Sequence, residues 1–527
     1  MEAFGLVLLA GLPFVLLFVL LIYLRWPAVK ALPVVWFLTL VIAVLMWRIE
    51  WMYIPASLLL SVLMALEIIL IILGAVWVLE IMKKSHHIEH IQNFLTTISP
   101  DARVQALIIG WIFVSLMEGV AGFGTPAAIA APLLVAIGFK PVLAVVVALI
   151  GNSVATTFGA AGTPVLLGLG SLGFERAVLE EVGILSAGLH VAASIVIPIS
   201  LVYIVSSELK RKKGSSVWDD VRPMIPFSIF AWAVFSVFYF LTASFVGPEL
   251  PSIMAALSSL IVLSFSAKKR FLVPANVVSF KRIRRKNVDR KKMFSSVSPY
   301  ILIVLFLMLT RIITPLRDFL GTVEFSTTIL GTSADFSYQP LFTPAFYFFL
   351  SGLICVFFFR MKRKDVTSSI KDAFTRIKTA TIALIFALGL VQLFMLSENN
   401  YSGLEGMPMV LAEATGDLFQ GFYPLISPMV GAFGSFISGS NTVSNILFGI
   451  FQSESAVALG VSIPLILALQ STGGAIGNMI AIHNVLAASA TVGIHHQEST
   501  IIRKTIVVML LYALVLGVLG MVLVGVM

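Results

Sequence analysis

The sequence is poor in charge and almost without cysteine. Only 12% of its 527 residues are charged, about half the fraction of an average soluble domain. The single cysteine, Cys355, lies in an apolar segment, which excludes a disulfide framework and a cysteine metal site. No G-x-x-x-x-G-K-S/T sequence and no H-E-x-x-H sequence occurs. ATP-driven transport and membrane-embedded enzyme chemistry are therefore unsupported, and no cofactor is expected.

What the chain has in excess is apolar length. Hydrophobic residues make up 59% of it, the mean hydropathy is +1.03, and many apolar segments are long enough to cross a hydrocarbon core about 30 Å thick. A membrane β-barrel would instead show short alternating segments. We expect an all-α, multi-pass protein of the cell membrane. The N-terminal residues lack a basic region and a cleavage site, so they predict a first span and not a cleaved signal.

The net charge of +9 comes from short basic loops, which favours cytoplasmic loops over nucleic-acid binding. The basic clusters are 210-KRKK-213, 268-KKR-270, 281-KRIRRK-286, 290-RKK-292 and 360-RMKRK-364. Placing the loops 206–223, 267–298 and 360–378 in the cytoplasm puts the loops 242–250, 315–341 and 397–423 outside, together with the N-terminus. The expected spans are 6–24, 32–48, 56–82, 141–169, 183–205, 224–241, 251–266, 299–314, 342–359, 379–396, 460–492 and 505–526.

Two regions fit poorly as simple crossings. Residues 104–138 read as two apolar arms around the glycine-rich tip 118-EGVAGFGTP-126, and residues 424–452 repeat the plan around 438-SGSNT-442. Arms of about thirteen helical residues reach only about 20 Å. We therefore predict two re-entrant hairpins with tips near mid-membrane, the first from the cytoplasm and the second from outside.

Each hairpin is followed by the same kind of element. The segments 141–169 and 460–492 run from a proline through apolar residues to polar, glycine-rich interruptions at 151–162 and 470–478. This indicates inverted repeats with discontinuous helices, as in secondary transporters. The predicted units are 1–55 as a two-helix scaffold segment, 56–205 as repeat 1, 206–298 as connecting helices and basic loops, and 299–527 as repeat 2.

The polar tips and interruptions predict a shared midplane site for a small anion. Broken helices present free N–H groups to anions and carbonyls to cations, and glycines allow close approach of a ligand. The substrate-binding candidates are Gly122, Gly124, Thr125, Asn152, Ser153, Thr156, Ser440, Asn441, Thr442, Ser471, Thr472, Gly473, Asn478 and His483. Small residues in membrane helices also serve close packing, so individual members can be structural.

Ionisable groups inside the membrane need a reason, because burying their charge is costly. Glu118 lies at the first tip and is the leading candidate for a proton carrier, with a fixed brace or an ion pair as the alternatives. Glu67 is a second candidate, either as a relay or in a structural pair. His190 suggests an interhelical hydrogen bond, and Arg311 is expected to snorkel from a span end. The cluster 86-HHIEH-90 lacks cysteine support, and we expect no metal there.

Several of these segments together resemble the lactate permease family. They are 118-EGVAGFGTPAAI-129, 138-GFKP-141, 399-NNYSGL-404, 438-SGSNTVSN-445 and 472-TGGAIGNM-479. The resemblance adds Tyr401 to the substrate-binding candidates. It implies proton symport of lactate or glycolate, an elevator-like mechanism and a possible homodimer. The chain departs from the family pattern at Asn441 and Asn478, where an Asp and a Lys are common, and at Ile482-His483.

The sequence leaves the coupling ion open. A sodium-coupled transporter of another small carboxylate would also use the polar second tip, because hydroxyl, amide and backbone oxygens are suitable ligands for a hard cation. A passive anion channel built on the same plan is a further alternative.

Overall fold

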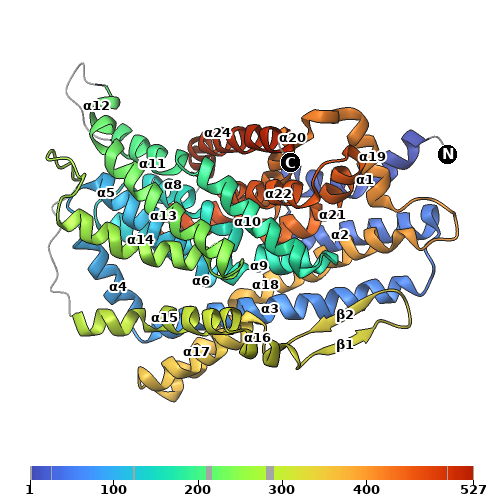
Figure 1. The fold of residues 1–527 in the computed structure, drawn as a ribbon, viewed down its shortest axis with the longest axis horizontal. Helices are drawn as coiled ribbons and strands as arrows, with labels where there is room; N and C mark the ends of the chain where they lie inside the picture. The colour runs from blue at the N-terminus through green and yellow to red at the C-terminus, as the bar shows by residue number, and fades with distance from the viewer. Residues whose placement is uncertain are drawn as a thin grey trace.

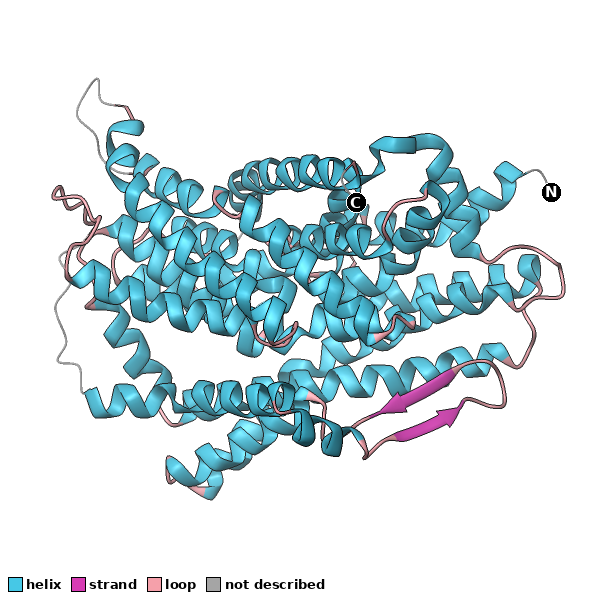
Figure 2. Cartoon of the chain, in the orientation of Figure 1, coloured by secondary structure: helices cyan, strands magenta, loops and turns pink. Residues whose placement is uncertain are grey.

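The computed structural model describes residues 3–24, 26–122, 125–208, 216–280, 290–494 and 497–525. This part of the chain is almost wholly helical (Figure 2). It contains 11 helices long and apolar enough to cross a membrane, or 12 if a bent pair counts as one span. The prediction of about 12 spans agrees with this number, but the candidates include Ala102–Ala121, which the sequence predicted as a hairpin arm, and leave out the 15-residue helix Pro344–Phe358 in the predicted span 342–359. The basic clusters 210–213 and 281–286 and the predicted site residue Gly124 lie outside the described residues.

The helices of the first half are α1 (Ala3–Phe18), α2 (Ala28–Ile42), α3 (Tyr53–Lys84), α4 (His87–Thr96), α5 (Ala102–Leu107), α6 (Val114–Ala121), α7 (Thr125–Ala136), α8 (Pro141–Asn152), α9 (Gly159–Thr163), α10 (Arg176–Ala193), α11 (Val196–Ser207), α12 (Trp218–Val221), α13 (Ile225–Phe245) and α14 (Pro251–Lys268). The second half holds α15 (Arg290–Ile312), α16 (Thr314–Gly321), β1 (Phe325–Thr328), β2 (Asp335–Tyr338), α17 (Pro344–Phe358), α18 (Arg363–Met395), α19 (Met407–Phe419), α20 (Tyr423–Ser438), α21 (Asn441–Leu459), α22 (Ile463–Gly477), α23 (Ile482–Thr491) and α24 (Glu498–Val524).

The helices form two groups that differ in their packing partners. The long helix α3 packs against α17 and α18, and α18 packs against α2, while α15 contacts α4 and α17. In Figure 1 α15, α16 and α17 lie along the lower side of the view together with β1 and β2. The second group holds α5 to α14 and α20 to α24, where α20 and α22 pack on each other and both contact α21 and α24. The main links between the groups run from α18 and α19 to α21 and from α3 to α6 and α9.

Within the second group, each half of the chain packs one helix of its hairpin against the broken helix of the other half. The second arm of the first hairpin, α7, packs against α23, which follows the break in the last repeat. The second arm of the other hairpin, α21, packs against the helical turn Pro164–Leu169, which follows the first break. Each hairpin therefore contacts the broken helix of the other half.

Loop contacts sort into the two sets that the charge pattern predicts. On the side predicted to be outside, the contacts are Ile49 with Asn400, Tyr53 with Ser333 and Arg176 with Glu249. On the side predicted to be cytoplasmic, they are Lys84 with Asp372, Arg103 with Asn276, and Glu208 with Lys140 and Lys504. No pair among these mixes the two sides. Which side faces the cytoplasm stays a prediction.

The hairpin arms are longer than the sequence predicted. The first arm is continuous over Ala102–Ala121, which is 20 residues, and α7 adds 12, α20 has 16 and α21 has 19. At 1.5 Å per residue the first arm and α21 each reach about 30 Å. The expectation of arms of about thirteen residues is met only by α7 and, less closely, by α20.

The two helix breaks differ from one another. In the first repeat, regular helix ends at Asn152 and the chain passes through a 3-10 turn, Val154–Phe158, to the left-handed residues Ala160, Ala161 and Gly162. In the second repeat α22 remains helical through Gly477. The predicted interruption 470–478 is therefore wrong over most of its length, and the break comes at 478–481.

Glycines in α22 allow close helix packing, which explains why that helix stays intact. A Cβ on Gly473 would meet the Pro428 carbonyl oxygen at 2.1 Å, and one on Gly474 would meet Asn441 Oδ1 at 2.0 Å. A Cβ on Gly431 of α20 would meet the Gln470 carbonyl at 2.1 Å. The role predicted for Gly473, close approach to a ligand, is replaced by close approach to α20.

The loop 315–341 is structured, and the all-α prediction misses this. Strands β1 and β2 pair antiparallel, with Phe325 opposite Tyr338 and Thr328 opposite Asp335 (Figure 2). The connecting segment turns at Leu330 and Gly331, both at positive φ. The sequence signal was a pair of short runs rich in Phe, Thr, Ser and Tyr on either side of a glycine.

We predict that Gly473→Ala destabilises the fold, because the new methyl group must separate α22 from α20. Overpacking of this kind costs about 1–3 kcal/mol, so the melting temperature in detergent should fall. Gly188→Ala is the matched control, since its Cβ would meet only Phe240 Cε2, at 3.8 Å. Equal melting temperatures for the two variants would contradict the packing role.

Candidate functional site

One cavity collects residues from both hairpins and both helix breaks, and we refer to it as the tip cavity. It is lined by Glu118, Gly122, Thr156, Gly159, Pro164, Gly439, Ser440, Asn441, Thr442 and Asn478. Its volume is about 10 Å³, close to the minimum that holds one water molecule. A larger ligand can enter only if the lining groups move apart.

Glu118 is the ionisable group of this cavity. It lies in the last turn of α6, it is 3% exposed, and its Oε2 has no hydrogen-bond partner among the described residues. The described residues that line the tip cavity with Glu118 include no Lys, Arg or His. An ionised carboxylate without a partner is very costly to bury, so a bound proton stabilises Glu118 in this arrangement.

The backbone around Glu118 is held in unusual conformations. Gly122 follows α6 at φ 55° and ψ −158°, a region that essentially only glycine occupies. Ala160 and Ala161 are left-handed, which costs about 1–2 kcal/mol for each non-glycine residue. Gly159 lies so close to Glu118 that a Cβ there would be 2.5 Å from Oε1. Strained backbone of this kind often marks a functional site.

The second tip contributes the beginning of a helix. Ser440 is the N-cap of α21, and its hydroxyl accepts a hydrogen bond from the Val443 N–H. Asn441 and Thr442 in the first turn line the tip cavity. The first N–H groups of a helix lack intrahelical partners and carry a partial positive charge. This side of the tip cavity therefore favours an anion.

Two asparagines connect the second tip to α22 and to the turn that follows the first break. Asn441 Nδ2 donates to the Ser471 carbonyl at 3.0 Å, and Asn445 Nδ2 donates to the Pro164 carbonyl at 2.9 Å and to Ser471 Oγ at 3.1 Å. Their Oδ1 atoms, like that of Asn152, are buried and have no hydrogen-bond partner among the described residues. The site thus holds unused acceptors beside its donors.

The other predicted site residues that the structure describes do not line the tip cavity. Hydroxyl groups of Ser153 and Thr472 donate to carbonyls one helical turn earlier, and Ser471 accepts from Asn441 and Asn445. Tyr401 is 66% exposed in a loop beside Arg48, and His483 is exposed beside Gly439. Thr125 begins α7, but its side chain is outside the described residues.

Glu67 belongs to a second cavity, which we call the arginine cavity. Its volume is about 200 Å³, and its lining includes Glu67, Thr163, Arg176, Glu249, Arg311 and Thr343. The expectation that Arg311 snorkels is wrong, because its side chain is 3% exposed and pairs with Glu249 at 2.8 Å. The two candidate proton carriers, Glu118 and Glu67, thus line different cavities.

Two of the histidines, His190 and His87, have structural partners. His190 is buried between the Thr157 and Tyr512 hydroxyls, each 2.7 Å from a ring nitrogen, so the predicted interhelical hydrogen bond is confirmed. His87 stacks on Phe359 with ring centroids 3.7 Å apart. In the described part of the chain, no group of three or more His, Cys, Asp or Glu residues is arranged to hold a metal ion.

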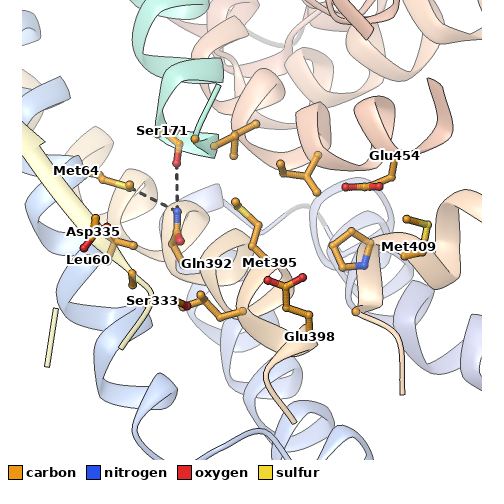
Figure 3. A pocket seen from close by; sticks show the side chains of 17 residues that line it. Leu60, Met64, Ser171, Ser333, Asp335, Gln392, Met395, Glu398, Met409 and Glu454 are labelled. Atoms are coloured by element: carbon orange, nitrogen blue, oxygen red, sulfur yellow. Dashed lines mark hydrogen bonds between the residues drawn. The ribbon is translucent and has the colours of Figure 1, made fainter. Parts of the chain in front are cut away.

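The largest of the three cavities described here lies elsewhere. It has a volume of about 380 Å³ and is lined by Gln392, Glu398 and Glu454 among others. In Figure 3 the Glu454 and Glu398 side chains come from different parts of the wall, and the Gln392 amide donates hydrogen bonds to Ser171 and Met64. It contains none of the predicted site residues.

Some functional candidates could not be singled out from the sequence. Gly159 and Pro164 line the tip cavity, but a glycine or a proline in an apolar helix carries no chemical signal by itself. The cluster of Arg176, Glu249 and Arg311 joins three distant segments. The sequence does contain a signal for this cluster. Its arginines stand at the ends of spans on the side predicted to be outside, where few positive residues are expected.

Taken together, the chain is a multi-pass helical membrane protein whose polar core lies where two helix hairpins meet two broken helices. The profile of the L-lactate permease family matches residues 6–527, so the chain belongs to that family of transporters. A putative L-lactate permease of Haemophilus influenzae is 34% identical and covers 94% of this chain and 95% of its own length. The L-lactate permease and the glycolate permease GlcA of Escherichia coli K12 are 28% and 29% identical, each covering 85% of this chain and 83% of its own.

Solved structures are more distantly similar. The YdaH transporter of Alcanivorax borkumensis aligns with a TM-score of 0.44 and 14% identity, covering 87% of this chain and 85% of its own. MtrF of Neisseria gonorrhoeae, described as one of a class of antimetabolite efflux pumps, gives 0.41 and 12%, covering 87% and 81%.

We predict that Gly159→Ala displaces the Glu118 carboxyl while leaving the fold intact. Gly159 has φ −64° and ψ 152°, which alanine adopts freely, and the atom its Cβ would meet is the end of a flexible side chain. Lactate uptake by cells expressing the variant should fall about 10- to 100-fold, as expected for a misplaced essential group.

Gly170→Ala provides the control for this substitution, since its Cβ would meet only Leu179 Cδ1, at 3.2 Å. Uptake is normalised to the amount of protein in the membrane. Undiminished uptake by a well-expressed Gly159→Ala variant would show that Glu118 is not part of the functional site.

Proposed function

We propose that the chain imports a small 2-hydroxymonocarboxylate, lactate or glycolate, by proton symport. The observation that carries the proposal is a buried carboxyl without a cation partner, Glu118, in a cavity of neutral donors. Among the described residues that line the tip cavity, none is Lys, Arg or His. Relatives named L-lactate permease and glycolate permease supply the substrate class.

The coupling follows from electrostatic repulsion between two carboxylates in one small cavity. A substrate anion beside ionised Glu118 would place two negative charges together without a counter-ion, which strongly disfavours binding. A proton on Glu118 removes this repulsion. Binding of the substrate therefore raises the affinity for the proton, and by reciprocity the proton raises the affinity for the substrate.

The substrate carboxylate is expected to lie on the α21 side of the tip cavity. Ser440 and Thr442 offer hydroxyl groups, the first turn of α21 offers backbone N–H groups, and Asn441 and Asn478 offer amides. The unused Asn441 Oδ1 and Asn152 Oδ1 are acceptors for the substrate hydroxyl. Asn441 and Asn478, the two positions where the chain departs from the family pattern, both line this cavity.

The remaining topological expectations belong to the same proposal. The two hairpins would enter from opposite sides of the cell membrane, with the N-terminus outside. The group of α5 to α14 and α20 to α24 would move against the group containing α3 and α18 in an elevator-like cycle. The protein would act as a homodimer, as the family resemblance implies.

A sodium-coupled carboxylate transporter is the second candidate. The unused amide oxygens of Asn152 and Asn441 suit a hard cation that binds oxygen ligands. A sodium ion would then supply the positive charge that the proton supplies in the first proposal. The two candidates differ in which ion gradient drives uptake.

The test is uptake of labelled lactate into proteoliposomes under a pH gradient alone or a sodium gradient alone. Proton symport predicts accumulation with an acidic exterior and none with sodium alone. The opposite result would establish the sodium mechanism. Lactate counterflow against a preloaded interior separates either transporter from a passive channel, which shows no counterflow.

We predict that Glu118→Gln abolishes pH-driven accumulation and retains lactate counterflow. Glutamine imitates the protonated carboxyl, so the substrate still binds and exchanges, but no proton can be released. Glu454→Gln is the control, because this carboxyl is half-buried in a different cavity. Full pH-driven accumulation by Glu118→Gln would show that another group carries the proton.

A further inference from the structure

The arginine cavity stands directly beside the tip cavity. Thr163 lines the arginine cavity, and the next residue, Pro164, lines the tip cavity. The left-handed segment Ala160–Gly162 runs between them, and a Cβ on Gly162 would meet the Pro248 carbonyl at 2.4 Å, so this segment packs on the loop that carries Glu249. In the predicted topology the arginine cavity opens toward the outside.

The chemistry of this cavity centres on a buried arginine. Arg311 Nε donates to Glu249 Oε1 at 2.8 Å, its Nη2 donates to the Phe342 carbonyl at 2.6 Å, and its Cζ lies 3.6 Å from the Phe342 ring centroid. Arg176 Nη2 reaches the same Glu249 oxygen at 3.0 Å. One carboxylate oxygen thus serves two arginines.

Three polar atoms in this cluster are unused. Arg311 Nη1, Glu249 Oε2 and Thr343 Oγ1 are buried and have no hydrogen-bond partner among the described residues. Arg311, Glu249 and Thr343 all line the arginine cavity. Thr343 precedes α17, but its hydroxyl does not cap that helix. Buried polar groups without partners are costly, so they are expected where a ligand completes them.

The three groups form a complementary set for one kind of ligand. A guanidinium N–H and a hydroxyl can donate to a carboxylate, and the bonds of Arg311 to Glu249 and to the Phe342 carbonyl hold its guanidinium in place. Glu249 Oε2 can accept from a hydroxyl group on the neighbouring carbon. The volume of about 200 Å³ is far above the minimum of about 10–15 Å³ for one water and accommodates a three-carbon acid.

We propose that the arginine cavity is an outer docking subsite for 2-hydroxymonocarboxylates, where the substrate carboxylate binds Arg311 and Thr343 and its hydroxyl donates to Glu249. This rests on the proposed function. From here the substrate passes Thr163 to the tip cavity once the segment Ala160–Gly162 moves. Ionised Glu67 on the same cavity wall would repel the anion. Binding of the substrate is therefore favoured when a proton neutralises Glu67.

The proposal is tested by uptake kinetics into right-side-out vesicles with Thr343→Val, which removes only the hydroxyl and keeps the side-chain shape. The KM for lactate should rise about tenfold, the effect of one lost hydrogen bond to a charged group, at unchanged maximal rate. The double substitution Glu249→Gln with Arg311→Gln should raise KM further and reduce the preference for lactate over propionate, which lacks the hydroxyl.

Arg317→Gln is the control, since Arg317 is an exposed arginine of α16 that pairs only with its neighbour Asp318 at 3.2 Å among the described residues. An unchanged KM in the Thr343→Val variant overturns the docking subsite, whatever the double variant does. Failure of the proposed function has a different signature, namely no pH-driven lactate uptake by the unaltered protein.

Discussion

Backbone that leaves a helix inside a bilayer must find its partners in protein, because hydrocarbon offers none. The core of this chain is organised around that requirement. Each hairpin turn lies against a broken helix, Gly122 beside Ala160 and Gly439 beside His483, and the arm after each turn packs against the broken helix of the other half. The polar site follows from this interlocking, because the turns and the breaks are where backbone groups are available.

The lack of polar partners in hydrocarbon also explains why the ionisable groups of the core are few and why their surroundings differ. Glu118 is buried in a cavity whose described lining holds no cation, an arrangement that favours a bound proton, whereas Glu249 is buried between two arginines, an arrangement that favours the charge. The proposed proton-coupled transport of anions would use both kinds of site. The first would allow charge to be neutralised in the core, and the second would attract the anion at the periphery.

Much of this organisation could be predicted from the sequence, and the failures have identifiable causes. Most span positions, the two polar tips and the first break are recognisable because apolar length and clusters of glycine and hydroxyl residues are local signals. The second break was misplaced, because Gly473 and Gly474 resemble a flexible segment in the sequence but serve helix contact in the structure. Arg311 was misjudged because its partner, Glu249, lies 62 residues away in the chain.

The sequence by itself determined that the chain is a multi-pass helical membrane protein with two polar hairpin tips, a buried Glu118 and the motifs of the lactate permeases. These properties follow from apolar length and from short motifs, which need no knowledge of long-range contacts. Only the tertiary structure decided that both tips and both breaks share one cavity, and that Glu67 belongs with Arg311 and not with Glu118. Such groupings depend on which helices pack together, and this is set by side-chain fit between segments far apart in the chain.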